Sequence, residues 1–178
     1  MRLFIDCEYD GYKGDLLTMA LVSEELDGLY FVRDDIQAKD PWVQENVVPF
    51  IFAHEDNDQT SMYVGSYEFL QGELEKILSY FQTVTIVADW PEDVAHFCNF
   101  LITGPGERIN TPPLAFSVRR DLDGVNSAVP HNALEDARSI ARLHRRLKKQ
   151  ADNFQRGLEP KQSSSKKHYF ETKETDNG

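Results

Sequence analysis

The chain has 178 residues, 40% of them hydrophobic, which is enough for one globular domain with a sizeable core. Its formal net charge of −11 argues against a general phosphate-binding surface, although metal ions and local basic residues would still allow a nucleic-acid partner. Nothing resembles a secretory signal or a membrane span, and two cysteines, Cys7 and Cys98, do not make a disulfide framework, so we expect a cytoplasmic protein.

The first part of the chain predicts three antiparallel strands. Residues 2–8 begin as an apolar strand that ends in acidic residues, and residues 15–23 form the second predicted strand. Asp27 and Gly28 are a hairpin turn signal, and the return strand begins at Leu29.

Helices and strands then alternate. Pro41 opens a predicted helix over 41–52, which Pro49 is expected to end or kink, and the polar residues 53–65 are predicted to be a loop. The remaining predicted elements are a helix over 66–81, a strand over 83–88, a helix over 91–102, a strand over 114–121 and a helix over 132–151.

This order predicts an α/β fold with a mixed five-stranded sheet, three antiparallel strands first, flanked by helices. The first strand is then central, and its acidic end lies where open α/β sheets bind ligands. We expect one domain over residues 1–151. From residue 152 to residue 178 the composition is polar, so this segment is predicted to be a disordered tail.

Asp6 and Glu8 form the first acidic pair. They lie two apart on a strand, so both side chains point to the same face. Two adjacent carboxylates raise each other's pKa unless a cation compensates them, and hard divalent cations prefer oxygen ligands. The alternative is an ordinary solvated strand end.

Two further carboxylates follow predicted helix starts. Asp89 with Glu92, and Asn132 with Glu135, have the spacing of a capping box. We therefore interpret Asp89 as a helix cap and the residues after the two glutamates, Asp93 and Asp136, as candidate metal ligands. Asp89 stays open as the competing candidate for the position of Asp93. The alternative for both is a favourable charge near a helix N-terminus.

His131 precedes Asp136 by five residues and lies just outside the last predicted helix. The usual pKa of histidine, about 6.5, suits a general base near neutral pH. The alternative is a surface histidine in a loop.

The order and spacing of these residues resemble the motifs of the DEDDh 3′→5′ exonucleases, the superfamily of ribonuclease T and oligoribonuclease. IDCE (5–8) is similar to the first motif, HNALEDA (131–137) to the third, and Asp93 falls on the second. The resemblance covers about residues 1–150 and implies a ribonuclease H-like fold. It also implies that Asp6, Glu8, Asp93 and Asp136 bind two Mg²⁺ or Mn²⁺ ions, and that His131 is the general base.

The segment PWVQENVVP (41–49) is similar to stand-alone exoribonucleases of the polyadenylate-specific AS type. That branch is cytoplasmic in bacteria or phage-borne and is dimeric. The resemblance implies a homodimer that acts on the 3′ ends of single-stranded RNA, or of DNA, and releases nucleoside 5′-monophosphates.

Three residues are candidates for substrate binding. Tyr9 and Trp90 adjoin two of the motifs and are predicted to stack on bases, the alternative being ordinary packing. Arg138 begins a basic stripe on the last helix that is predicted to bind phosphates, the alternative being a solvated face.

Two other functions stay open. The motifs indicate the reaction but not whether the substrate carries ribose or deoxyribose, so a DNA-preferring exonuclease of the same fold is one alternative. A non-catalytic nucleic-acid-binding protein on a nuclease fold is the other, although all five motif residues are present.

Overall fold

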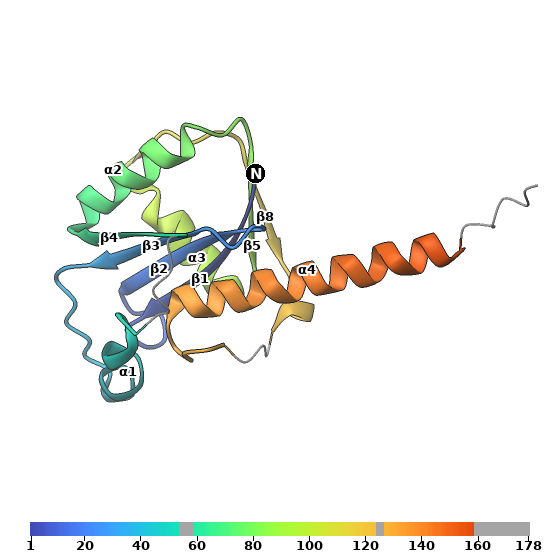
Figure 1. Ribbon diagram of the computed structural model, residues 1–178. Coiled ribbons are helices and arrows are strands. Elements are labelled where there is room, and N and C mark those ends of the chain that lie inside the picture. Colours follow the sequence, from blue (N-terminus) through green and yellow to red (C-terminus); the bar gives the residue numbers. More distant parts are fainter. Residues whose placement is uncertain (54–58, 124–126, 159–178) are drawn as a thin grey trace, which may run out of the picture.

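A mixed six-stranded sheet is the central layer of the computed structural model, which describes residues 1–53, 59–123 and 127–158 (Figure 1). Its strands follow the order β4-β3-β2-β1-β5-β8. They are β1 (Arg2–Tyr9), β2 (Leu16–Ser23), β3 (Gly28–Arg33), β4 (Thr60–Gly65), β5 (Val84–Ala88) and β8 (Leu114–Val118). The predicted α/β fold, with three antiparallel strands first, is confirmed.

The structure corrects the number of strands. Residues 60–65, predicted to be part of a loop, form β4 and pair with β3 in parallel, so the sheet has six strands rather than five. β4 lies at the sheet edge and exposes Ser61, Met62 and Val64, so its sequence lacks the apolar alternation of a half-buried strand. A short hairpin of β6 (Ile102–Gly104) and β7 (Glu107–Arg108) was also not predicted. Residues 54–58 lie outside the described chain.

The strands of the main sheet share one polarity apart from β2. β2 pairs with β1 and β3 in antiparallel fashion, whereas β4, β5 and β8 each pair in parallel with their neighbours. The carboxyl ends of β1, β3, β4, β5 and β8 therefore meet at one edge of the sheet. Ligands of open α/β sheets bind at such an edge.

Helices cover both faces of the sheet (Figure 1). The helices of the described residues are α1 (Pro41–Asn46), η1 (Val48–Phe50), α2 (Tyr67–Leu78), α3 (Pro91–Phe100), η2 (Arg120–Leu122) and α4 (Ala133–Leu158), of which α2 and α3 cover one face and α4 the other. Leu3, Ile5 and Cys7 of β1 pack with α2 and α3, whereas Phe4 packs with α4. This alternation divides the core into two layers.

The last helix is longer than its sequence suggested. Residues 152–158 belong to α4, so the predicted tail does not begin at residue 152. No proline or glycine interrupts the chain between Ala133 and Arg156, so nothing in this stretch stops the helix. Residues 148–156 are exposed, and this end of α4 projects beyond the sheet (Figure 1). The rest of the predicted tail, residues 159–178, lies outside the described chain.

Two smaller expectations concern the cysteines and the membrane. Cys7 and Cys98 are free thiols, as expected. Within the described ranges, no helix has both the length and the apolar character needed to cross a membrane. Pro49 lies in the 3-10 turn η1 that follows α1, consistent with its predicted role as a helix terminator.

Candidate active site

The first two carboxylates come from the carboxyl end of β1. Asp6 and Glu8 pair with Ala20 and Thr18 of β2, and Cys7 between them is buried on the opposite face. One carboxylate oxygen each from Asp6, Glu8 and Asp136 lie within 4.8 Å of one another. The prediction that Asp6 and Glu8 share a face is confirmed.

Asp136 reaches this position because α4 has a fixed start. The Asn132 side chain accepts a hydrogen bond from the Glu135 N–H at 3.2 Å and donates to the Phe50 and Ile51 carbonyls at 2.7 and 3.1 Å. The predicted cap by Asn132 is therefore confirmed. It holds the first turn of α4 against the carboxyl edge of the sheet, where Asp136 meets β1.

The predicted cap by Asp89 is wrong. Trp90 is the N-cap of α3, and its side chain makes no capping hydrogen bond. Pro91 occupies the first helical turn, which places the cap at the residue directly before it. The carboxylate of Asp89 instead lies with those of Asp6 and Asp93, with one oxygen of each within 4.8 Å of the others.

Asp6 therefore belongs to two carboxylate groups at once. Glu8 and Asp136 complete the first group, and Asp89 and Asp93 complete the second. Asp93 is 3% exposed, and its Oδ1 accepts the Cys7 backbone N–H at 3.2 Å, which ties α3 to β1. The structure thus brings together all four sequence-predicted ligands and adds Asp89.

The electrostatics of this cluster are unfavourable without a cation. Burial, with the neighbouring carboxylates, raises the pKa of Glu8 to about 8 and that of Asp93 to about 8. Burial likewise raises the pKa of Asp6, Asp89 and Asp136. Of the described residues that line the surrounding cavity, none is a lysine or an arginine. Bound divalent cations would therefore compensate the charge.

The chain was compared with known proteins. No model of a protein family matches it, and no curated protein matches it significantly. The functional argument accordingly depends on the geometry and the chemistry of the site.

His131 adjoins the carboxylates. Its φ of 63° lies in the left-handed region, and its backbone N–H donates to Oδ2 of Asp136 at 3.1 Å. The residue lines the same cavity as Asp6, Glu8 and Asp136. The structure thus brings the predicted general base to the predicted metal ligands.

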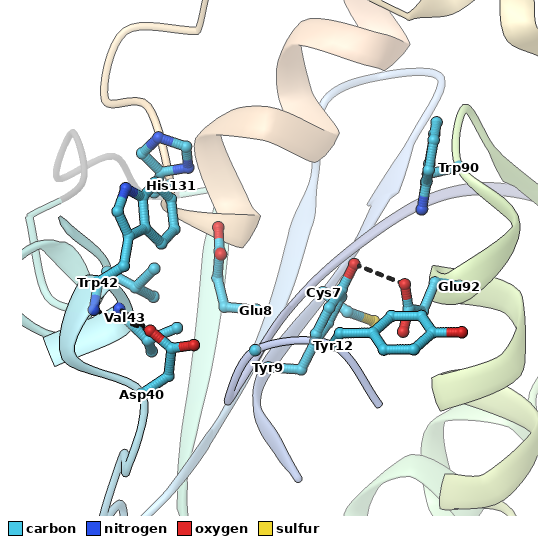
Figure 2. A pocket seen from close by; sticks show the side chains of 12 residues that line it. Cys7, Glu8, Tyr9, Tyr12, Asp40, Trp42, Val43, Trp90, Glu92 and His131 are labelled. Carbon is cyan, nitrogen blue, oxygen red and sulfur yellow. Dashed lines mark hydrogen bonds between the residues drawn. The ribbon is translucent and has the colours of Figure 1, made fainter. Parts of the chain in front are cut away.

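A groove with aromatic walls lies beside the carboxylates. It has a volume of about 510 Å³ and is lined by Tyr9, Tyr12, Trp42 and Trp90, with Glu8 and His131 shared with the acidic cavity. Figure 2 shows Trp42 and His131 on one side of this groove, Tyr12 and Trp90 on the other, and Glu8 between them. The groove gives flat apolar surfaces next to the carboxylates.

The two aromatic residues predicted to bind substrate both line this groove. Tyr9 stacks on His96 with ring centroids 4.5 Å apart, and its hydroxyl donates to Glu92 at 3.2 Å, so packing occupies one of its ring faces. Trp90 is 45% exposed, and the Arg120 guanidinium lies 4.2 Å from its ring centroid. Base stacking by either residue stays a prediction.

The predicted role of Arg138 is wrong. Its side chain is 1% exposed, forms an ion pair with Glu135 and donates to Thr60. A buried guanidinium paired in this way does not reach solvent phosphates. The helical spacing correctly places Arg138 on the same face of α4 as Arg142 and Arg145. At Arg138, however, this part of α4 is packed against the sheet and is buried.

Sequence reasoning placed neither Asp123 nor Trp42 at the site, and it considered Asp89 only as a competitor of Asp93. Asp123 lines the acidic cavity and forms an ion pair with Arg120 at 2.7 Å. Trp42 lines the groove but was noted in the sequence only as part of a motif. The signal for Asp89 was present, because Pro91 at the helix start excludes Asp89 as the cap.

Proposed function

We propose that this chain is a metal-dependent 3′→5′ exonuclease of the DEDDh type on a ribonuclease H-like fold. The observation that carries the proposal is the carboxylate of Asp6, which is common to two groups of three carboxylates. One carboxylate common to two groups can hold two cations close together, as in two-metal phosphodiesterase sites. His131, at the same cavity, supplies the remaining residue of the motif set.

The ligand chemistry fits Mg²⁺ or Mn²⁺. All five candidate ligands, Asp6, Glu8, Asp89, Asp93 and Asp136, offer carboxylate oxygens, which hard divalent cations prefer. Asp6 would contact both ions, Glu8 and Asp136 the first, and Asp89 and Asp93 the second. Burial and raised pKa values are the expected state of such ligands when no cation compensates them.

In the proposed reaction, water attacks the last phosphodiester, and the bond from phosphorus to the 3′ oxygen of the preceding nucleotide breaks. Ions held by these carboxylates would supply Lewis-acid stabilisation of the attacking and leaving oxygens. The imidazole of His131 accepts the proton of the attacking water, and the leaving 3′ oxygen takes up a proton. The product is a nucleoside 5′-monophosphate.

The proposed substrate is single-stranded RNA with a free 3′ end, because the segment around Trp42 resembles stand-alone exoribonucleases. DNA is the competing substrate, and the two differ at the 2′-hydroxyl. The same resemblance underlies a proposed homodimer and a proposed location in the cytoplasm of a bacterium or of a phage-infected cell. Sedimentation measurements would test the dimer directly.

The decisive experiment uses 5′-labelled single-stranded RNA and DNA, each with a free or blocked 3′ end, with Mn²⁺ or with excess chelator. We expect a ladder that shortens from the free 3′ end, in Mn²⁺ alone. Asp6→Asn should lower the rate by at least about 10³-fold, or more than about 4 kcal/mol in barrier, because it removes the carboxylate shared by both groups.

Glu107→Gln is a matched control, since Glu107 is exposed on β7 and lines neither the acidic cavity nor the groove. Full activity in excess chelator would overturn the two-ion proposal. Binding of RNA without cleavage under any metal condition would favour the non-catalytic alternative.

A further inference from the structure

The helix that carries Trp42 is fastened to the end of β1. The carboxylate of Asp10 accepts the backbone N–H groups of Lys39 and Asp40, each at 2.9 Å. The Asp40 carboxylate in turn caps α1, accepting from the N–H groups of Trp42 at 2.8 Å and Val43 at 3.3 Å. The backbone at Trp42 is thus held in place by two successive carboxylates.

The apolar side of α1 adds to this anchorage. Val43 is 2% exposed and packs with Leu17 of β2 and with Val47. Gly11 leaves room for the cap, because a Cβ atom at this position would lie 2.8 Å from a carboxylate oxygen of Asp40. Trp42 therefore projects from a rigid support next to the acidic cavity.

The side chain of His131 has much less support. Its backbone is held by the hydrogen bond to Asp136, but within the described residues no hydrogen bond reaches its imidazole. Its ring instead meets the Trp42 indole, with centroids 5.0 Å apart and planes at 83° (Figure 2). Such edge-to-face pairs contribute about 0.5–1.5 kcal/mol beyond the area that they bury.

We propose that Trp42 is a positioning residue that holds the imidazole of His131 beside the carboxylates. This inference rests on the proposed function, in which His131 accepts a proton. Trp42 is 53% exposed and also lines the groove, so one residue forms both a wall of the groove and the support of the base. A ligand that stacks on Trp42 would then restrain the base as well.

The first test reads the ring contact without any activity measurement. The chain has five histidines, and His131→Gln identifies the ring-proton signals of His131 in the NMR spectrum. We expect Trp42→Leu to change the chemical shifts of these signals, because the ring current of the indole is lost. Trp42→Phe should retain part of the ring-current contribution. Unchanged His131 signals in Trp42→Leu would overturn the proposal.

The second test measures kcat and KM on the substrate that the wild type cleaves. Trp42→Leu should lower kcat by about 10- to 100-fold, because a displacement of the His131 imidazole by about 1 Å can reduce the rate by such a factor. Trp42→Phe should keep most of the wild-type kcat. In the His131→Gln background, Trp42→Leu should leave kcat unchanged, because the residue acts through His131. Additive losses of kcat, or an effect on KM alone, would overturn the proposal.

Two variants complete the design. Asp10→Ala removes the acceptor of the Lys39 and Asp40 N–H groups without changing either ring, and it should also lower kcat. Tyr80→Leu is the control, because Tyr80 is 84% exposed and lines neither cavity. If the wild type cleaves no nucleic acid, the proposed function fails, whereas the NMR signals still decide whether Trp42 holds the ring.

Discussion

The position of Asp89 beside Asp6 and Asp93 changes what substitutions of these residues are expected to do. A capping role would tolerate Asp89→Asn, because asparagine also caps well. A role as ligand would not. We expect Asp89→Asn and Asp93→Asn each to lower turnover at least about tenfold, or about 1.4 kcal/mol in barrier.

Calorimetric titration with Mn²⁺ checks this prediction independently of turnover. Both variants should bind the ion more weakly than the wild type and than the Glu107→Gln control. Wild-type turnover and Mn²⁺ affinity in Asp89→Asn would show that Asp89 is a neighbour of the site rather than a part of it.

His131 is predicted to contribute to the rate and not to metal binding, because the candidate ligands are carboxylates. His131→Ala should lower turnover by about 10²–10⁴-fold at saturating Mn²⁺. The Mn²⁺ affinity should stay at the wild-type value. If turnover stays near that of the wild type, the imidazole is not the general base.

At the scale of elements, Arg138 joins α4 to β4 through Thr60 and to its own helix through Glu135. Breaking one half of a buried ion pair costs about 3–5 kcal/mol. Arg138→Met should therefore lower the free energy of unfolding by about this amount, as measured in urea, without raising KM. The paired change with Glu135→Leu should recover part of the loss.

Arg145→Ala is the matched control on the exposed part of the same helix and should unfold like the wild type. A higher KM in Arg138→Met at unchanged stability would restore the phosphate-binding role that the sequence suggested.

Elements with a strong apolar pattern were predictable, and elements at edges were not. β1 and β5 are buried, and their apolar runs gave both position and type. β4 has one neighbour and an exposed face, so its sequence reads as polar. Carboxylate spacing predicts the cap of α3 at Asp89, whereas Pro91 in the first turn places it at Trp90.

In the candidate site, the residues of the motifs were predictable, and those brought in by tertiary packing were not. Motif spacing located Asp6, Glu8, Asp93, Asp136 and His131, all of which line one cavity. The position of Asp89 depends on the pairing of β1 with β5, in which Phe4 lies opposite Val87. Asp89 directly follows β5, and one of its carboxylate oxygens lies within 4.8 Å of one from Asp6. Trp42 reaches His131 only through tertiary packing, which no local pattern encodes.

For the whole molecule, the buried carboxylates make stability depend on pH. The pKa of Glu8 rises from 4.5 to about 8 in the folded state, so the folded protein binds more protons than the unfolded chain between these values. Stability of the metal-free protein is therefore lost as pH rises through this window. The lowered pKa values of Asp10 and Asp35 affect stability only below this window, whereas the lowered pKa values of His96 and His144 oppose the fall in its lower part.

Thermal unfolding in chelator should show a midpoint that falls between about pH 5.5 and about pH 8.5. Saturating Mn²⁺ should reduce this fall, and Glu8→Gln should remove part of it in the metal-free protein, because Asp93 also has a pKa of about 8. A midpoint that stays constant or rises across the window would contradict the raised pKa values.

The shared polarity of β1, β3, β4, β5 and β8 places the carboxylates at one end of the molecule and leaves the other end without them. Met1 lies at the opposite edge of the sheet from the carboxylates, where its ammonium group donates to the Thr83 carbonyl at 2.9 Å. α4 starts at the end with the carboxylates and leads away from it (Figure 1). A label, bead or fused domain attached before Met1 would therefore lie behind the sheet and leave open the path of the long polymer that the proposed function requires.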